Sequence, residues 1–586
     1  MEGYSNKSIN LFKVYILSSD SLFRLTKLFQ SKGKEMRFFK RNVILFLALV
    51  FSFSTYAGVN LKNGNFYISY TDIVVPGTGK TLEMTRTYNS KSTEKGWFGF
   101  GWGNIFETKL IESPDGCVVV HEHGAGGKTR FCPKNAVDPK KAAQKIVDAM
   151  RKRSPLTGNA EKNLMKRLVN NAELRHVYAR KFGVKSKIAK GTTLYSNERG
   201  IQKVAVTDTG FVRSSNDGKQ EFFNKAGQLE KIKDKNNYVV EFSYKDKQLY
   251  SIKDSFAKQI YFSWYSNGKV KKMWSAKDKF AEFKYNGDDL IYSKDVGGNA
   301  YGFEYDNNHN LLKVVYNPNR KKGEKEDSMK MEYESKTFFI SKITDRNDDT
   351  TVYKYGASAK NPKDHYWTEV TKKGFNNKLV TNKYEYEIKT RPDGSRYTYR
   401  IMTKISGIKT ETIYSECCGL PLKIARGKIV TNFEYNDKGL LTKKSSTRGE
   451  YVEIAYDKVH NKISRVKNKN GVTTFTYDKK GNLKQAENSK GKAVLLIYNN
   501  KGKIQKMVDK DKKTKKTRVL SFQYNSLGKP VEIEMVKVGK IQVAYDNYGE
   551  IKRVESKQGH KMALQVTQAF QNLLAIVKPA GVNLNM

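Results

Sequence analysis

The chain has 586 residues, with 108 Lys and Arg against 59 Asp and Glu, which gives a formal net charge of +49. A net positive charge of this size favours anionic partners in general, among them lipopolysaccharide, phospholipid headgroups, acidic cell-wall polymer and nucleic acid. It does not distinguish between them. The chain has only seven histidines and they are scattered, so the composition gives little support for catalysis.

The first 57 residues contain a predicted secretory signal peptide. From Met36, "MRFFKRNVILFLALVFSFSTYA" has a basic start, an apolar stretch from Val43 to Phe53 and a small residue at Ala57. The apolar stretch is short for a transmembrane span, and the alternative is a buried N-terminal helix. We therefore expect translation to begin at Met36, export to the periplasm, outer surface or medium, and a mature N-terminus at Gly58. The leader carries nine basic and three acidic residues, which leaves about +43 for the mature chain.

Residues 58–135 are predicted to form a leading β segment. "GVNLKNGNFYISY" alternates as a strand does, and glycine-rich turns such as "GWFGFGWG" follow it. These glycines are not followed by Lys-Ser/Thr and do not open a helix, so they do not predict a nucleotide site.

Two cysteines of this segment, Cys117 and Cys132, flank "HEHGAGGK". If they pair, residues 121 and 128 also pair and a two-residue loop remains at 124–125. In an exported protein a cross-strand disulfide is the first expectation. Zinc is the rival, because His121 and His123 share a face with Cys117. However, four strand residues separate Cys117 from His121 by roughly 13 Å, too far for two ligands of one ion.

Residues 136–185 interrupt the β pattern. "DPKKAAQKIVDAMRKRS" is rich in Ala and Lys, and Ala142, Ile146, Ala149 and Met150 fall at helical spacing. The segment predicts a basic helical insertion that packs against the rest of the protein. Binding of a membrane surface or a partner is the alternative.

Residues 186–556 contain a short motif that recurs. In "FTYDKKGNLKQ", residues 475–485, Phe475 and Tyr477 fall on one face of a strand, and Asp-Lys-Lys-Gly has the chemistry of a tight turn. Gly481 can take the positive φ of the bulge that closes such a hairpin. Other copies include "FEYDNNHNLLKV", "FEYNDKGLLTK" and "VAYDNYGEIKRV".

The copies recur about every 20 residues, which indicates stacked hairpins that complete their core against their neighbours. The repeated tyrosines are therefore expected to pack and the Asp and Gly to steer the backbone. The reference tyrosines are Tyr244, Tyr265, Tyr285 and Tyr305 in a first block, and Tyr435, Tyr456, Tyr477, Tyr498, Tyr524 and Tyr545 in a second.

Residues 557–586 form the last predicted unit. "KMALQVTQAFQNLLAIVKP" places Val566, Phe570, Leu573 and Val577 on one helical stripe. We expect this helix to dock on, or plug, the last turn of the sheet.

The repeat resembles the YD repeat of Rhs proteins, a group that also includes teneurins and shell components of insecticidal Tc toxins. The leading segment is similar to the one that precedes the repeats in bacterial Rhs proteins, with an Arg-x-Tyr-Asn-Ser match at 86–90 and a Gly-x-Gly-Trp match at 99–102. The resemblance implies that the hairpins form a long spiralling antiparallel sheet, a partial or closed shell. Together with the residue patterns, it predicts a mainly β fold of YD-repeat hairpins with a small helical insertion.

Self-cleavage and a C-terminal toxin are not carried over from the family. Its toxin-bearing members have an Asp-Pro-x-Gly-type motif near the end of the shell. Here Asp-Pro occurs only at Asp138-Pro139, and 41 residues follow Tyr545.

Cys417 and Cys418 form an unexplained thiol pair in "CCG". A vicinal disulfide, a pair with another chain and two free thiols all remain open.

No enzyme activity, catalytic residue, cofactor site or metal site is predicted. The main hypothesis is an exported scaffold at the cell envelope or surface that binds an anionic polymer or glycan. The alternative is an Rhs-type shell that encloses a separately encoded effector, and a third hypothesis is a hydrolase of envelope polymers. Nucleic acid is not favoured, because the aromatics occupy packing positions instead of interleaving with the basic residues. The lysines then serve as solvated faces that limit aggregation of a long sheet.

Overall fold

The computed structural model describes residues 56–573, except 76–79, 154–157, 197–201, 216, 236, 246–247, 277, 375–376, 418, 526–528, 546–550, 557–561, 563, 570 and 572. The predicted signal peptide therefore lies almost wholly outside the described residues, as do Phe570 and Val577.

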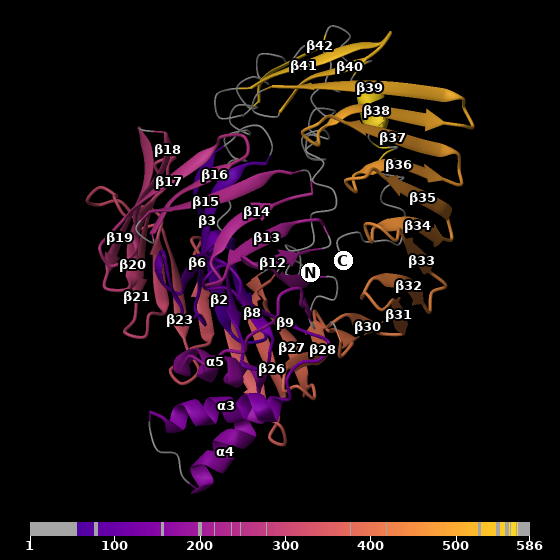
Figure 1. The fold of residues 1–586 in the computed structure, drawn as a ribbon. Helices are drawn as coiled ribbons and strands as arrows, with labels where there is room; N and C mark the ends of the chain where they lie inside the picture. The colour runs from indigo at the N-terminus through magenta and orange to yellow at the C-terminus, as the bar shows by residue number, and fades with distance from the viewer. Residues whose placement is uncertain are drawn as a thin grey trace.

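The protein is built on one antiparallel sheet of sequential hairpins, as predicted (Figure 1). Its first strands are β7 (Lys109–Glu112), β8 (Val118–His121), β9 (Lys128–Cys132), β10 (Thr193–Ser196), β11 (Lys203–Val206), β12 (Gly210–Ser214), β13 (Gln220–Asn224), β14 (Leu229–Lys233), β15 (Val239–Lys245), β16 (Gln248–Asp254), β17 (Gln259–Trp264), β18 (Val270–Ala276), β19 (Lys279–Asn286), β20 (Asp289–Lys294), β21 (Ala300–Tyr305), β22 (Leu311–Val315), β23 (Ser328–Tyr333) and β24 (Ile340–Thr344).

The same sheet continues to the end of the repeat region. Its remaining strands are β25 (Thr350–Ala357), β26 (His365–Lys373), β27 (Leu379–Thr390), β28 (Arg396–Ile405), β29 (Ile408–Tyr414), β30 (Pro421–Arg426), β31 (Ile429–Tyr435), β32 (Leu441–Ser446), β33 (Tyr451–Tyr456), β34 (Ile463–Asn468), β35 (Gly471–Tyr477), β36 (Leu483–Asn488), β37 (Lys492–Tyr498), β38 (Ile504–Asp511), β39 (Lys516–Tyr524), β40 (Pro530–Met535), β41 (Gly539–Tyr545) and β42 (Ile551–Ser556).

Turn chemistry explains why consecutive strands pair. At the turn after β35, the Asp478 carboxylate accepts the backbone N–H groups of Lys480 at 2.9 Å and Asn482 at 2.8 Å. Gly481 sits at φ 72°, and the register shifts by one residue just before Tyr477, which faces Leu483. This arrangement is the bulged hairpin that the sequence predicts.

The repeat tyrosines join each hairpin to the one before it. The Tyr477 hydroxyl donates to the carbonyl of Ile463, the first residue of the second strand in the preceding hairpin, at 2.6 Å. The same bond recurs along the sheet, from Tyr244 to Leu229, Tyr285 to Val270, Tyr333 to Leu311, Tyr355 to Ile340, Tyr435 to Pro421, Tyr456 to Leu441, Tyr498 to Leu483, Tyr524 to Ile504 and Tyr545 to Pro530.

Two positions of the predicted series differ. The Tyr305 hydroxyl accepts the Nε1–H of Trp102, in the leading segment, at 2.9 Å. Trp264, not Tyr265, stands where the register shifts, and its Nε1–H donates to the Leu249 carbonyl at 2.7 Å. The Tyr265 hydroxyl instead donates to the carbonyl of Phe283. An indole N–H can replace the phenol because both end an aromatic side chain in a donor.

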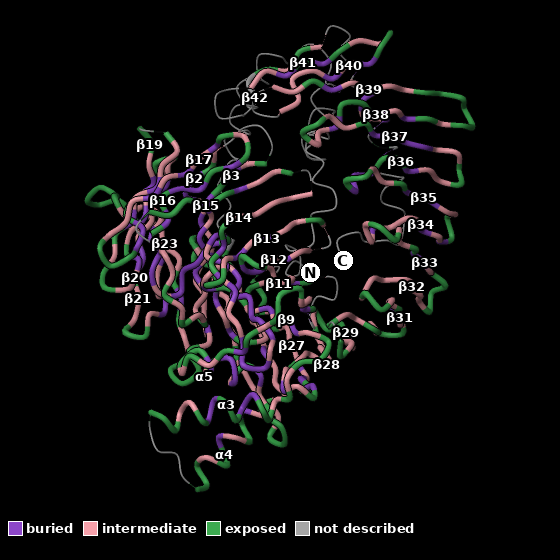
Figure 2. Tube along the Cα trace, viewed as in Figure 1, coloured by how far each residue is buried: buried purple, intermediate pink, exposed green. Residues whose placement is uncertain are grey.

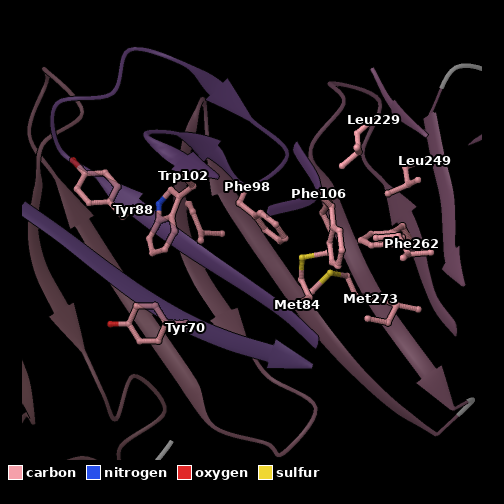
Figure 3. Packing of buried hydrophobic residues seen from close by; sticks show 14 of the residues in the cluster. Tyr70, Met84, Tyr88, Phe98, Trp102, Phe106, Leu229, Leu249, Phe262 and Met273 are labelled. Carbon is pink, nitrogen blue, oxygen red and sulfur yellow. The ribbon is translucent and has the colours of Figure 1, made fainter. Parts of the chain in front are cut away.

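The leading segment forms a small sheet that lies inside the curve of the main sheet (Figure 1). Its order is β1-β2-β3-β6, from β1 (Tyr56–Asn60), β2 (Asn65–Val75), β3 (Leu82–Asn89) and β6 (Trp102–Asn104), beside a two-stranded ribbon of β4 (Lys95–Gly96) and β5 (Gly99–Phe100) and a 3₁₀ turn, η1 (Ile105–Glu107). Figure 3 shows its buried side chains, including Tyr70, Met84 and Trp102, packed against main-sheet residues such as Phe262 and Met273.

The predicted helical insertion consists of three helices, α3 (Pro139–Arg151), α4 (Gly158–Val169) and α5 (Ala172–Phe182). They share a small core that includes Ile146, Val147 and Leu168, so their apolar faces are buried against one another. Helix α5 also ties distant strands together. His121 Nε2 on β8 lies 2.8 Å from His176 Nε2, and the Ala172 N–H donates to the Gly394 carbonyl at the β27–β28 turn.

Helical residues near the C-terminus pack on the last strands, as the predicted docking requires. Met562, Val566, Ala569 and Leu573 are buried in one cluster with side chains of β33–β41. Arg518 on β39 also donates to the side-chain oxygens of Gln565 and Gln568. No helix among the described residues is long and apolar enough to cross a membrane.

The main sheet is open. Among the described strands, β42 pairs with β41 and β7 pairs with β8, and no register joins β42 to β7. At its beginning the sheet curls onto itself, since Lys109 bridges Gln228. Farther along, turns from distant repeats meet without forming a ladder, and Lys235 Nζ donates to the Gly481 carbonyl at 3.2 Å.

Candidate functional site

The face of the sheet that carries the repeat tyrosines, here called the tyrosine face, is the candidate functional surface. The leading sheet covers its first part, where β16–β24 contribute to the larger core. The C-terminal helical residues cover its last part, over β33–β41. Residues of β27–β31, here called the open stretch, belong to neither cluster. The leading segment reaches only its beginning, where Lys62 Nζ donates to Thr398 at 2.7 Å and Tyr386 and Ile388 are buried.

Most side chains of the open stretch are half-exposed or exposed, as the prevailing colours of these strands in Figure 2 show, and Tyr386, Ile388 and Phe433 are buried. In the middle of each strand the side chains on the tyrosine face are hydroxyl-bearing, amide or apolar, and all are uncharged. They are Asn382, Tyr384, Tyr386, Ile388, Thr398, Ile401, Thr403, Thr410, Thr412, Tyr414, Ile424, Thr431 and Phe433.

The opposite face of these strands carries the charges. Arg400 donates to Glu411 at 3.0 Å, and Lys383 lies 3.2 Å from Glu385. His365 Nε2 is 2.6 Å from the same Glu385 carboxylate. Because side chains alternate across a strand, the two faces of one sheet differ in chemistry. In the open stretch these ion pairs therefore lie on the face opposite the repeat tyrosines.

The tyrosines of this region offer neutral hydroxyl groups. Burial raises the pKa of Tyr353, on the neighbouring β25, to about 12 and also raises the pKa of Tyr384. At neutral pH both rings therefore remain protonated. The side chains in the middle of these strands can hydrogen-bond and pack without charge, and the cations at the borders of the surface are Lys62, which donates to Thr398, and Arg426, which pairs with Thr410.

The predicted cysteine pair joins β8 and β9, and the sulfurs of Cys117 and Cys132 are bonded at 2.14 Å. His121 faces Lys128 in the ladder, as the pairing requires. The loop is longer than the predicted two residues, because the Glu122 N–H donates to the Gly127 carbonyl and leaves four residues in the turn.

His121 is directed toward His176 and not toward a metal-ligand set. Burial, and to a lesser degree the neighbouring His176, lowers the pKa of His121 to about 3. Burial also lowers the pKa of His176 to about 4, so the contact is between two neutral rings. Within the described ranges, no group of three or more His, Cys, Asp or Glu is arranged to hold a metal ion.

The structure describes one of the two cysteines in the second motif. Cys417 is disulfide-bonded, which disagrees with the free-thiol alternative, and Cys418 lies outside the described residues.

The bonded pair leads to a chemical prediction. Peptide mapping without reductant should recover the strands around Cys117 and Cys132 as one species, because both sulfurs are buried and joined. Alkylation before denaturation should spare both residues. Quantitative labelling of both thiols in native exported protein would contradict the pairing.

Comparison with known proteins matches only part of the chain to a family. Residues 57–128, the leading sheet and the first strands of the ladder, match a family described as a domain of unknown function, DUF6531. No curated protein matches the sequence.

Solved structures with a similar course of the chain include Tc toxin assemblies. A crystal structure of TcdB2-TccC3-TEV is 9% identical, with 92% of this chain and 32% of that chain covered and a TM-score of 0.36. The Tc holotoxin pore of Photorhabdus luminescens is 9% identical, with 84% and 29% covered and a TM-score of 0.34. The chain thus spans about a third of the length of these proteins, and at such low scores neither function nor residue roles are transferred from them.

Proposed function

We propose that this protein is a repeat scaffold that holds a protein partner against the open stretch of its tyrosine face. One observation carries the proposal: the chain covers both ends of this face with its own segments and leaves a middle whose central side chains are uncharged and mostly half-exposed, among them Thr, Ile and Tyr. Neutral surfaces that combine apolar area with hydroxyl groups suit protein contacts, in which charged residues are depleted from the buried centre.

The sequence resemblance to Rhs shells also supports a protein partner, because those shells enclose an effector. A separately encoded protein is therefore the partner that we propose, and binding, not catalysis, is the proposed activity. An anionic polymer or glycan remains the rival partner. Its support is the net charge of +49, and such a ligand would have to use the charged surfaces outside the open stretch.

A pair of photo-crosslinkable variants tests the proposal. Ile401 and Met402 are neighbours on β28, both half-exposed, and Ile401 pairs with Thr412 on the tyrosine face whereas Met402 pairs with Glu411 on the opposite face. p-Benzoylphenylalanine placed at 401, in the cells that naturally produce the protein, should give one major protein adduct. The same group at 402 is the matched control and should not give it.

Unfolding midpoints of the two variants should agree, which separates loss of contact from loss of structure. Equal adducts from 401 and 402, or no protein adduct from 401, would contradict the proposal. Loss of envelope binding only after removal of lysines, with no protein adduct, would favour the anionic-polymer function.

Export is part of the proposed function and gives a separate prediction. Signal peptidase should cut after Ala57, so the mature protein should begin at Gly58. N-terminal sequencing or mass spectrometry of exported material measures this directly. An N-terminus near Met1 in that material would contradict both the cleavage and the proposed start at Met36.

A further inference from the structure

Two buried arginines meet where the helical insertion joins the main sheet. Arg175 on α5 is fully buried, and only 12% of the Arg130 side chain on β9 is exposed. Asp115, just before β8, accepts a hydrogen bond from Arg130 Nη2, and Arg175 Nε lies 3.7 Å from the same carboxylate oxygen. The two guanidinium groups therefore share one carboxylate.

Several N–H groups of these arginines have no acceptor. Arg175 Nη1 donates to the carbonyls of Leu168 and Val169. Its Nη2 donates to the carbonyl of Asp393, in the β27–β28 turn. However, Arg175 Nε and the Nε and Nη1 atoms of Arg130 are buried and have no hydrogen-bond partner among the described residues. Such groups are rare in native proteins, so they indicate an acceptor that the chain itself does not supply.

The charges at this junction do not balance. Both arginines keep their charge at neutral pH. Burial alone would raise the pKa of Asp115, but Arg130 and Arg175 hold it below its ordinary value, so this carboxyl is ionised. Burial lowers the pKa of His176, the next residue of α5, to about 4, so its ring adds no charge. Two guanidinium groups thus meet one carboxylate, which leaves one positive charge in excess.

The nearby acids have other partners. Glu173 pairs with Lys128 at 2.5 Å, and Glu94 pairs with Arg180 at 2.7 Å. The Asp393 carboxylate accepts the N–H and hydroxyl groups of the serine two residues later. Among the described residues, these three carboxylates form no ion pair with the two buried arginines.

A buried charge is costly unless it has a partner of opposite sign. Arg213 shows the usual arrangement, since its guanidinium donates to Glu122 at 2.7 Å and to Glu221 at 3.2 Å. The partner missing beside Arg130 and Arg175 must accept hydrogen bonds and carry one negative charge. A water molecule would meet only the first condition, and a divalent anion would leave an excess of negative charge.

We propose that a chloride ion binds at this junction and accepts the unsatisfied N–H groups of Arg130 and Arg175. Chloride is monovalent, so it balances the excess charge, and it has no organic part for a buried site to enclose. The site joins three parts of the protein, because Arg130 lies in the β8–β9 hairpin and Arg175 connects α5 to the β27–β28 turn. Chloride should therefore stabilise the docking of α5, whatever partner the open stretch binds.

Hydrogen exchange in two salts of equal ionic strength tests the site. Gluconate is the comparison anion, because it is too large to replace chloride in a buried site. In the wild-type protein the α5 amides should exchange at least about tenfold more slowly in sodium chloride than in sodium gluconate, since a ligand that binds only the docked form lowers the population of the open form. Amides of β35 and β36, which lie far from α5 (Figure 1), should exchange equally in both salts.

Two arginine variants separate this site from a general effect of salt. Arg130→Met removes the excess charge and two of the three unsatisfied atoms, and it leaves Asp115 beside Arg175. Its α5 amides should exchange at the same rate in both salts. Arg151→Met is the matched control, because it removes an exposed arginine of the same insertion that pairs with Glu161. This variant should keep the difference between the salts.

Bromide in crystals of the wild-type protein gives a second measurement that needs no variant. Bromide replaces chloride and scatters anomalously, so an anomalous peak should appear beside the guanidinium groups of Arg130 and Arg175. Equal exchange of the wild-type α5 amides in the two salts, or a difference that persists in Arg130→Met, would overturn the proposal. A water oxygen at the junction without an anomalous peak would overturn it as well.

Discussion

Replacing Arg86 with methionine should lower the free energy of unfolding by about 3–5 kcal/mol at neutral pH, because it leaves a buried carboxylate without its partner. Arg86 is fully buried on β3 and its Nε–H donates to Asp72 at 2.8 Å. A second nitrogen donates to the Ser293 hydroxyl on β20 at 2.6 Å. The guanidinium also lies 4.6 Å from the Trp102 ring centre. The side chain therefore ties the leading sheet to the main sheet.

The loss should depend on pH in a defined direction. Burial raises the pKa of Asp72 to about 6, while Arg86 opposes that rise. A carboxyl whose pKa is higher in the folded state destabilises the fold as pH rises through that window. Without Arg86 the pKa should rise further, so the difference between Arg86→Met and wild type should be smaller at about pH 5 than at about pH 8.

Urea denaturation at the two pH values measures both effects. Arg400→Met is the control, because Arg400 pairs with Glu411 and Glu387 on the charged face and is about a third exposed. An exposed pair should cost only about 0–1 kcal/mol. A loss of similar size for the two arginines, or a loss for Arg86→Met that grows as pH falls, would contradict the interpretation.

Local signals in the sequence predicted the hairpins, because each is specified within about ten residues by an aromatic strand end and an Asp/Asn-x-x-Gly turn. Tyr333 and Tyr355 were missed for the same reason. They make the same bond to the preceding hairpin, but "MEYESKT" and "YKYGASA" lack the turn that marks the other copies. Trp264 was not predicted because the repeat pattern is defined by tyrosine.

The candidate surface could not be predicted from any short segment of the sequence. Thr412 and Ile401 alternate with charged residues in the sequence, and only the ladder register places them on the same face as the repeat tyrosines. Arg86 was recognised in the sequence as part of a motif. Its buried contacts with Asp72 and Ser293 could not be predicted, because these two residues lie on different sheets. The excess of basic residues could be read from the composition. The concentration of ion pairs on one face of the sheet could not.

Replacing Tyr477 distinguishes packing from chemistry at a repeat tyrosine. The ring is half-buried at the edge of the cluster that includes Phe475 and Leu496, and the hydroxyl donates to Ile463. Tyr477→Phe keeps the ring and loses that hydrogen bond, so it should cost about 1 kcal/mol. Tyr477→Ala removes the ring and should cost about 3 kcal/mol, the lower end of the range for aromatic truncation, because the side chain is not fully enclosed.

The loss of stability in Tyr477→Ala should be confined to nearby repeats, because stacked units depend mainly on their neighbours. Hydrogen exchange of Tyr477→Ala should quicken around Tyr456 and Tyr498, the adjacent copies, and remain unchanged in the leading sheet. Tyr451 is the control: it is half-exposed on the opposite face of β33, and truncating it to alanine should cost less than about 1 kcal/mol, as at most surface positions. Photo-crosslinking from position 401 should persist in Tyr477→Phe. A Tyr477→Phe protein with wild-type stability and no partner adduct would instead make this tyrosine a binding residue, because structure alone could not explain the loss.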